Sequence, residues 1–372
     1  MASLSVCMIV RDEEPVIGRC LSAVAVFADE IIVLDTGSRD RTAEIARTYT
    51  DRVFSEPWQD DFAAARNASY RKARCDYVMW MDADDVVRPE QAQLLRRRMD
   101  ALPDTVDGVL LPYAVHEPGR AEVFDSYLLR DRILRRSLHP VWENAVHEAI
   151  SLDPDWQLEI WRDIPVYHDK LVVNEEGRNL RIFETQMARG WVLDNFSAGY
   201  YCRELFLAGQ HEQAVRVFEK LVDSGAEDFI VYNALQYYIS SMETLKRYRQ
   251  LADTLLDYVQ RWGETELVCC ELGRCFLKEK DWNTAEHWYQ RALAVKLDDT
   301  DLKIHCRAWN TVVPWVQLAR ISLKKRQPDQ AQVYLDQAKR LAGNDKMVLL
   351  VQLMVERQKA GQAEQKAVYY KG

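Results

Sequence analysis

Three of the four residues in Asp82-Ala83-Asp84-Asp85 are aspartates, and they directly follow an apolar segment, Tyr77–Met81. Alternate residues of an extended chain point to the same side, so Asp82 and Asp84 can converge. Converging carboxylates at the end of a buried strand suit Mg²⁺ or Mn²⁺, and such an ion can hold a diphosphate. The same pattern also fits a solvated acidic turn that caps the next helix, and these four residues alone do not decide between the two.

A second acidic residue stands in an equivalent place. Asp35 and Thr36 follow the apolar segment 30–34 and precede a predicted helix, for which Asp40 is a plausible N-cap. A carboxylate there could accept hydrogen bonds from a nucleobase or a ribose, although a glycine turn with capping residues explains it equally well. Arg66 lies between the two acidic segments, on a helix of small residues, where a guanidinium could contact a base or phosphates. The alternative for Arg66 is an ordinary surface arginine.

Four ordered segments resemble the family-2 glycosyltransferases of the GT-A fold. They are SVCMIVRDEE, DEIIVLDTGSRDRT, DDFAAARN and DYVMWMDADD, and together they span roughly the first 90 residues. The resemblance implies inverting transfer of a sugar from a nucleoside diphosphate, with a family-level preference for uridine. It also implies that Asp82-Ala83-Asp84 fills the DxD position, which coordinates Mg²⁺ or Mn²⁺. Thr36 stands where many members carry a second aspartate.

The same resemblance implies a set of residues around the donor. The nucleotide-sugar site is expected to include the end of the first strand, the loop after it, the second acidic segment, the arginine and the DxD segment: Val10, Arg11, Glu13, Asp35, Thr36, Arg66, Asp82, Ala83 and Asp84.

Further along the chain, the segment from Trp142 to Glu148 and then Val166-Tyr167-His168 resemble the acceptor side of a subgroup that carries tetratricopeptide repeats. That subgroup includes peptide glycosyltransferases, among them the S-glycosyltransferases of bacteriocin biosynthesis. It implies Glu148 as the base, with Glu143 as second choice. His168 is the expected third metal ligand, beside Asp82 and Asp84, while His147 remains an alternative ligand or orients the base.

The elements that position these residues can also be predicted. Apolar segments 4–10, 30–34, 52–55 and 77–81 alternate with amphipathic helix patterns, which indicates a mostly parallel sheet with helices on both faces. In such a sheet, ligands bind at the carboxyl ends of the strands. We therefore expect an α/β GT-A domain over residues 1–190.

From about residue 195 the pattern is helical throughout. Superposing Ala214, Ala285 and Ala331 aligns large apolar residues four positions later and small residues twelve positions earlier. This spacing resembles the tetratricopeptide repeat and predicts an all-helical repeat domain over residues 195–372, with a generic helical bundle as the alternative. A weaker copy is expected at Ala252, with Leu256 and Val259 in the matching places.

The repeats favour a polypeptide acceptor, either a Ser or Thr hydroxyl or a Cys thiol, and they could also form a homodimer. Tryptophans, among them Trp282 and Trp315, could anchor a peptide, although at helical spacing they are more often core residues. The open alternatives are transfer to a cell-surface glycan and a non-catalytic repeat scaffold.

Composition and charge exclude several classes of protein. The net charge of −9 argues against general binding to nucleic acid or anionic lipid, and the apolar runs are too short to span a membrane. The N-terminus reads as a strand and not as a signal peptide, and the cysteines lack a zinc-binding arrangement, so reduced thiols and a cytoplasmic location are expected. A methyltransferase or sugar-nucleotide pyrophosphorylase would need a glycine-rich loop near the N-terminus, and no GxGxxG occurs.

Overall fold

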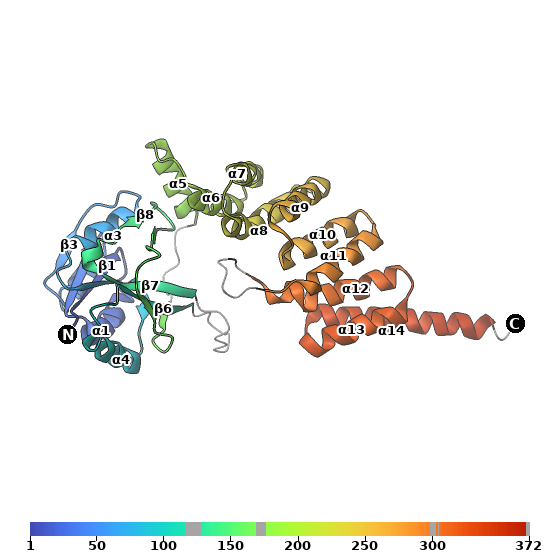
Figure 1. The fold of residues 1–372 in the computed structure, drawn as a ribbon, viewed down its shortest axis with the longest axis horizontal. Helices are drawn as coiled ribbons and strands as arrows, with labels where there is room; N and C mark the ends of the chain where they lie inside the picture. Colours follow the sequence, from blue (N-terminus) through green and yellow to red (C-terminus); the bar gives the residue numbers. More distant parts are fainter. Residues whose placement is uncertain (116–127, 169–175, 298–302, 304, 370–372) are drawn as a thin grey trace. The chain divides into compact units, whose positions relative to one another are not determined.

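The computed structural model describes residues 1–115, 128–168, 176–297, 303 and 305–369. The chain divides into two compact units, residues 1–192 and residues 193–372 (Figure 1). The first unit contains a sheet with helices, and the second is entirely helical in its described part. Each unit is described by itself below.

A mixed sheet of nine strands forms the centre of the first unit. Its strand order is β3-β2-β1-β4-β7-β6-β11-β5, with β10 pairing on β6. Strands β1, β2, β3 and β4 run parallel to one another, and the predicted alternation of strands and helices over this part is confirmed. The bounds are β1 Leu4–Val10, α1 Ile17–Phe27, β2 Glu30–Asp35, α2 Thr42–Ala46, β3 Val53–Ser55, α3 Phe62–Tyr70, β4 Tyr77–Trp80 and α4 Pro89–Asp100.

Helices cover both faces of this sheet. Leu4, Val6 and Met8 of β1 belong to one core cluster, which includes the buried faces of α1 and α4. Cys7 points the other way, into a cluster with Val78 and with Ala63 and Tyr70 of α3. Because successive strand residues alternate in direction, an unbroken apolar strand such as β1 can fill two cores at once.

The remaining strands were not predicted. They are β5 Asp85–Val86, β6 Gly108–Val115, β7 Leu128–Arg135, β10 Leu158–Ile160 and β11 Val166–His168, while β8 Trp142–Glu143 and β9 Ala149–Ile150 form a separate two-stranded sheet. Strand β7 is antiparallel to both β4 and β6. Its sequence, LLRDRILR, lacks an apolar run, and its Arg132 is buried in an ion pair with Asp85. Helix α5 (Arg178–Ala188) ends the described part of this unit.

The second unit is a series of helical hairpins. Its helices are α6 Asn195–Leu207, α7 His211–Asp223, α8 Asp228–Thr244, α9 Tyr248–Trp262, α10 Glu266–Lys278, α11 Trp282–Ala294, α12 Val312–Lys324, α13 Pro328–Ala342 and α14 Lys346–Tyr369, with the short 3-10 helix η2 Arg307–Asn310 before α12. Most connections are a few residues long, but residues 295–311 separate α11 from α12. An insertion therefore interrupts the repeat between these two helices.

The same turn closes successive hairpins. Gly209, Lys246, Lys280 and Arg326 each have positive φ, between 58° and 72°. The residue after each donates its N–H to a carbonyl five residues earlier, for example Gln210 to Leu205 and Asp281 to Phe276. This is the Schellman arrangement, which satisfies the last carbonyls of the first helix before the chain reverses.

The position of this turn shows that the repeat copy expected at Ala252 was predicted in the wrong register. Ala214, Ala285 and Ala331 lie five residues after their turns and are fully buried. The corresponding residue after Lys246 is Leu251, which is fully buried with Leu255, whereas Leu256 is 39% exposed. The prediction of Ala252, Leu256 and Val259 was wrong by one residue, because a leucine occupies the position that is alanine in the other copies.

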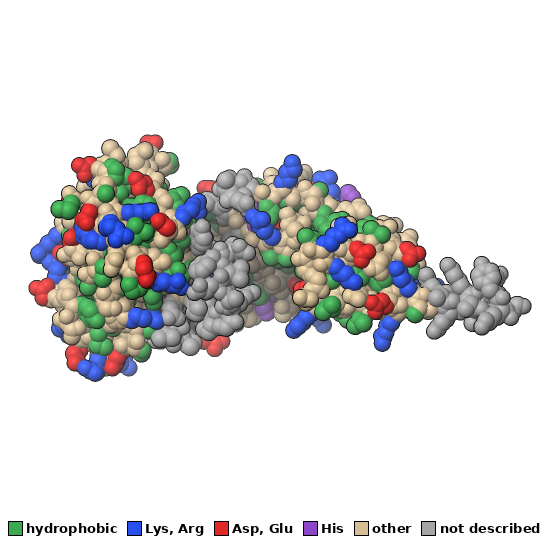
Figure 2. All heavy atoms as spheres, turned by 90° about the horizontal axis from the view of Figure 1, so that it is seen from below, with side chains coloured by type: hydrophobic (Ala, Val, Ile, Leu, Met, Phe, Trp, Pro, Cys, Tyr) green, Lys and Arg blue, Asp and Glu red, His purple; other side chains and the backbone are tan. Residues whose placement is uncertain are grey.

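Basic and acidic side chains are interspersed over the described surface seen in Figure 2. Within the described residues, no helix is sufficiently long and apolar to cross a membrane.

Candidate active site

The carboxyl ends of three parallel strands meet at one edge of the sheet. Val10 at the end of β1 pairs with Asp35 at the end of β2, and Cys7 of β1 pairs with Trp80 at the end of β4. The segments that follow β1, β2 and β4, which the sequence predicts to hold the donor, therefore share this edge.

The loops after β1 and β2 are tied together. The N–H groups of Asp12, Glu13 and Glu14 donate to side-chain oxygens of Ser38, Thr42 and Asp40, at 3.0, 2.7 and 3.0 Å. In the other direction, the N–H groups of Arg39 and Arg41 donate to the carboxylates of Asp12 and Glu14, at 2.6 and 3.0 Å. Because each loop satisfies the polar groups of the other, this corner of the site is fixed before any ligand arrives.

Asp35 and Thr36 both make local bonds. Asp35 Oδ1 accepts from the N–H groups of Gly37 and Ser38 and from the Ser38 hydroxyl, at 3.2, 2.9 and 2.7 Å. Thr36 donates its hydroxyl to the Val10 carbonyl at 3.1 Å. Oδ1 of Asp35 thus builds the turn, and the predicted contact of Asp35 with a nucleoside stays a prediction.

Glu13 lies near the acidic residues that follow β4. Burial raises its pKa to about 7, and the carboxylates of Asp84 and Asp82 add to this effect. Its Oε2 is buried and has no hydrogen-bond partner among the described residues. Crowded carboxylates of this kind repel one another and favour a bound cation.

Arg66 connects two of the predicted site residues. Its Nε donates to Glu148 Oε1 at 2.8 Å, and one terminal nitrogen donates to Asp82 Oδ1 at 2.9 Å. The guanidinium also lies 4.8 Å from the Trp80 ring and 5.0 Å from the Trp142 ring. Burial alone would lower the pKa of Arg66, but the two carboxylates outweigh it and raise that pKa. Arg66 is therefore a buried cation with fixed partners and not a surface arginine.

Three side chains could hold a metal ion between them. Ligand atoms of Asp84, Asp85 and His168 all lie within 4.8 Å of one another. Strand β11 places His168 opposite Asp85 of β5, and His168 Nδ1 is 3.3 Å from Asp84 Oδ1 and 3.6 Å from Asp85 Oδ1. The two carboxylates raise the pKa of His168 to about 10. Carboxylates that favour a proton on the imidazole would favour a divalent cation in its place.

Asp85 owes its position to Arg132, a residue that the sequence analysis missed. Both side chains are fully buried, and Asp85 Oδ2 accepts from Arg132 at 2.8 Å and from the Asp82 N–H at 3.0 Å. The guanidinium lies 3.6 Å from the Trp80 ring and 4.6 Å from the Tyr113 ring. Asp85 Oδ1 has no hydrogen-bond partner among the described residues and is the oxygen nearer to His168. An unsatisfied buried carboxylate oxygen at this place is suited to be a ligand of a hard cation.

The other predicted residues divide into two groups. Asp84 and His168 lie together, while Asp82 is held by Arg66 and is outside the Asp84–Asp85–His168 group. Glu148 is mostly buried against Arg66, whereas Glu143 is exposed and accepts from the Ser151 hydroxyl at 2.9 Å. The metal and catalytic roles of all these residues remain predictions.

Val10 is buried, Arg11 is exposed beside Asp12, and Ala83 is buried in the core. His147 adopts a positive φ of 55°, and its ring centroid lies 6.3 Å from that of Phe183. The roles of Val10, Arg11, Ala83 and His147 likewise remain predictions.

Comparison with known proteins identifies the first unit. Residues 5–144 match the profile of Glycosyl transferase family 2, and this range contains β1 to β7, Arg66 and the acidic residues after β4. The first unit contains a family 2 glycosyltransferase domain. It is therefore the enzymatic part of the chain. Residues 269–303 match a tetratricopeptide repeat profile, which covers most of α10 and all of α11.

Two curated relatives align with more than half of this chain. A TPR repeat-containing protein of Synechococcus elongatus is 28% identical over 286 residues, which cover 71% of this chain and 69% of that protein. The SPbeta prophage-derived glycosyltransferase SunS of Bacillus subtilis is 25% identical over 250 residues, 64% of this chain. The latter alignment spans 56% of SunS, so this chain matches about half of that protein's length.

Solved structures show more distant likeness. S. aureus TarS residues 1–349, solved with UDP-GlcNAc, is 16% identical, with a TM-score of 0.40 over 81% of this chain and 95% of that one. Glucosyl-3-phosphoglycerate synthase from Mycobacterium tuberculosis, solved with Mn²⁺ and UDP-glucose, is 17% identical, with a TM-score of 0.36 over 52% of this chain and 81% of that one.

Proposed function

We propose that this protein is a metal-dependent inverting glycosyltransferase that moves a sugar from a uridine diphosphate donor to a polypeptide side chain. The observation that carries the proposal is the convergence of Asp84, Asp85 and His168 beside Arg66, at the carboxyl edge of a family 2 glycosyltransferase domain. A divalent cation and a buried guanidinium are the two kinds of charge that a diphosphate requires.

The donor half of the site is built from the tied loops and the end of β4. Glu13 and Asp35 present carboxylates at the edge where the nucleoside would lie, and the crossed loop hydrogen bonds hold them in place. Because these groups are fixed in advance, little conformational entropy is lost when the nucleotide binds. The uridine preference comes from the family resemblance.

The metal site fits the residues that are present. Two carboxylates and one imidazole, with one buried oxygen unsatisfied, match the oxygen-rich and nitrogen-tolerant coordination of Mn²⁺ and also admit Mg²⁺. A bound ion would supply Lewis-acid stabilisation of the departing diphosphate. Asp82 could contribute only its second carboxylate oxygen, because Oδ1 accepts from Arg66.

Glu148 is the proposed base. It would take the proton from the acceptor hydroxyl or thiol as that atom bonds to the anomeric carbon and the bond to the diphosphate oxygen breaks. Arg66 donates to Oε1 of Glu148 and to Oδ1 of Asp82, which leaves Oε2 of Glu148 to accept the proton. Arg66 thereby links the acceptor side to the donor side. Glu143 is less suited because it is exposed and already bonded to Ser151.

A polypeptide acceptor is supported by the helical unit. The tetratricopeptide repeat profile matches part of its hairpin series, and such a series could hold an extended chain. The acceptor is therefore proposed to be a peptide with a Ser, Thr or Cys side chain, and the protein to act in the cytoplasm. A homodimer through the repeats stays a proposal.

Asp84→Asn tests the donor chemistry. Nucleoside diphosphate release from a panel of nucleotide sugars would be followed with Mn²⁺, with Mg²⁺ and with chelator. We expect release by the wild type to need metal and to fall at least about 100-fold in the variant, because a ligand charge is lost without a change of shape.

Asp104→Asn is the matched control, because Asp104 is an exposed aspartate in the same unit. Equal loss in both variants would point to general damage and not to a metal ligand. Metal-independent release by the wild type, or release with none of the donors, would contradict the proposal.

A further inference from the structure

A groove in the second unit is lined by cations. It encloses about 350 Å³ between α10, α11 and α12, and its wall includes Arg274, Lys278, Arg320 and Lys324. Trp282, Tyr289, Leu277 and Ile321 form its apolar part, and Gln317 is the remaining lining residue. No aspartate or glutamate lines this groove, in a chain whose net charge is −9.

Three of the four cations lack an ion pair. Arg274 contacts the carboxylates of Glu243 and Glu271, so its charge is neutralised. Within the described part of the chain, Lys278, Arg320 and Lys324 form no ion pair. Lys278 lies over the Tyr248 ring at 5.3 Å, and Arg320 donates only to the amide oxygen of Gln317, at 3.3 Å.

The lack of carboxylates is a property of the groove and not of the region. Lys325, the neighbour of Lys324, is not among the lining residues and contacts Glu286 at 2.5 Å. Lys325 is thus paired, whereas Lys278, Arg320 and Lys324 in the wall of the groove are left for a ligand. Unpaired like charges around one depression raise the local potential and attract an anion.

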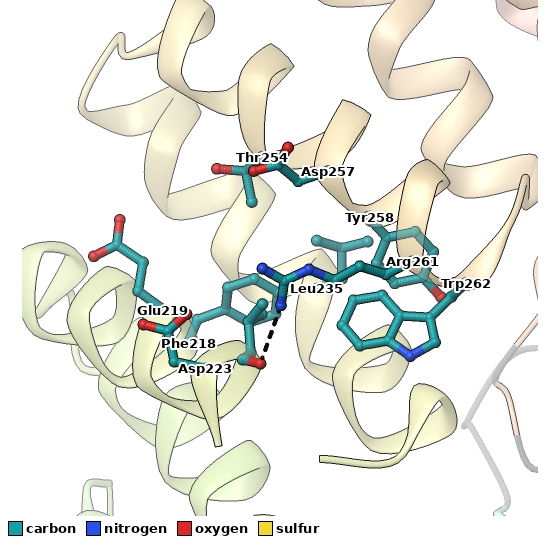
Figure 3. A pocket seen from close by; sticks show the side chains of 10 residues that line it. Phe218, Glu219, Asp223, Leu235, Thr254, Asp257, Tyr258, Arg261 and Trp262 are labelled. Atoms are coloured by element: carbon teal, nitrogen blue, oxygen red, sulfur yellow. Dashed lines mark hydrogen bonds between the residues drawn. The ribbon is translucent and has the colours of Figure 1, made fainter. Parts of the chain in front are cut away.

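A second pocket of the same unit has the opposite character. About 300 Å³ in volume, it lies between α7, α8 and α9, with Glu219, Asp223 and Asp257 around Tyr258 and Trp262 (Figure 3). Arg261 crosses it and donates to the Val222 carbonyl at 3.4 Å. The helical unit therefore does not present one uniform charge, and the cationic groove is a local feature of α10–α12.

We propose that the groove between α10 and α12 binds an acidic stretch of a polypeptide. The three unpaired cations would meet its carboxylates, and Trp282 with Ile321 would cover an apolar side chain between them. A groove with an apolar floor and separated cations matches spaced carboxylates on an extended chain better than a single compact anion. Under the proposed function, which this inference rests on, the polypeptide is the acceptor, held at a segment apart from the glycosylated side chain.

The test is binding by the full-length protein of two labelled peptides, one of alternating Glu and Ala and one of alternating Lys and Ala. We expect the acidic peptide to bind and the basic one not to, with affinity that falls as salt is added. Arg320→Glu combined with Lys324→Glu should weaken binding at least about tenfold, because attraction becomes repulsion at two exposed positions. Lys220→Glu, an exposed charge reversal on α7, is the control and should bind as the wild type does.

Equal binding by the wild type and the double variant, or no binding of the acidic peptide, would overturn the proposal. Competition by a single-stranded oligonucleotide as strong as that by unlabelled acidic peptide would also overturn it, since the groove would then be a general anion surface. Donor hydrolysis by the double variant should equal that of the wild type. If the acidic peptide binds but no peptide is ever glycosylated, the groove stands and the acceptor proposal fails.

Discussion

At the residue scale, the site depends on two buried arginines that the acidic pattern alone does not reveal. Arg66 joins Asp82 to Glu148, and Arg132 holds Asp85. Both guanidiniums also contact Trp80. Several carboxylates can be gathered at one strand end only if cations close by compensate their repulsion. The arginines therefore permit an acidic cluster before any metal ion binds.

Arg132 supports a prediction about stability. Arg132→Met removes the partner of a fully buried carboxylate, and we expect it to cost about 3–5 kcal/mol of unfolding free energy, because Asp85 would be left as an unpaired buried charge. Adding Asp85→Asn should recover a large part of this loss. Urea unfolding of the wild type, both single variants and the double variant measures the coupling. Additive single effects would show that the two side chains do not act as a pair.

At the element scale, the repeat depends on small residues where helices approach closely. Gly273 of α10 is such a position, since a Cβ added there would lie 2.8 Å from the Tyr289 ring of α11. Cys202 and Ala319 occupy the same place in two other hairpins, seven residues before the turn, and both are fully buried. In the hairpin of α10 and α11, position 273 has no side chain, and the Tyr289 ring of the facing helix fills the space.

Gly273→Ala tests this exchange, with Gly199→Ala as its matched control. Gly199 lies in α6, and a Cβ there would meet Ile230 at an ordinary 3.5 Å. Both changes gain helix propensity of about 0.5–1 kcal/mol. We expect Gly199→Ala to keep that gain and Gly273→Ala to lose about 1–3 kcal/mol through overpacking. Thermal unfolding measures both, and stabilisation by Gly273→Ala would show that the Tyr289 ring moves aside at little cost.

At the scale of the whole molecule, the chain consists of a glycosyltransferase unit and a helical unit of similar length. Each has its own hydrophobic clusters, which is the property that allows a unit to fold by itself. The groups proposed for donor chemistry all lie in residues 1–192, and the proposed acidic-peptide groove lies in residues 193–372. We propose that donor hydrolysis and peptide binding can be separated by cutting the chain at this boundary.

A fragment of residues 1–192 should therefore fold and release nucleoside diphosphate within about threefold of the full-length rate. Transfer to a peptide acceptor should fall much further, because the proposed peptide groove is absent. Parallel assays of donor hydrolysis and peptide transfer measure the two effects. Equal peptide transfer by the fragment and the full chain would show that the helical unit does not hold the acceptor.

Much of this architecture follows from the sequence by itself. Buried parallel strands such as Leu4–Val10 and Tyr77–Trp80 are apolar throughout, and their helices repeat apolar residues at helical spacing, so local pattern determines both elements. The acidic segments around Asp35 and Asp84 were likewise expected from the sequence to follow strand ends at one edge, while their roles in binding stay predictions. The copies at Ala214, Ala285 and Ala331 were found because a small buried residue is required at each.

Other features were decided only by tertiary structure. Strand β7 carries Arg132 in a sequence that reads as an exposed, charged segment, and only its pairing between β4 and β6 buries that residue against Asp85. His168 meets Asp85 because β11 pairs with β5 across 82 intervening residues, a pairing that no local pattern records. Arg66 meets Glu148 in the same way. Short-range periodicity reports which side of an element is buried, but it carries no information on which distant side chain is buried with it.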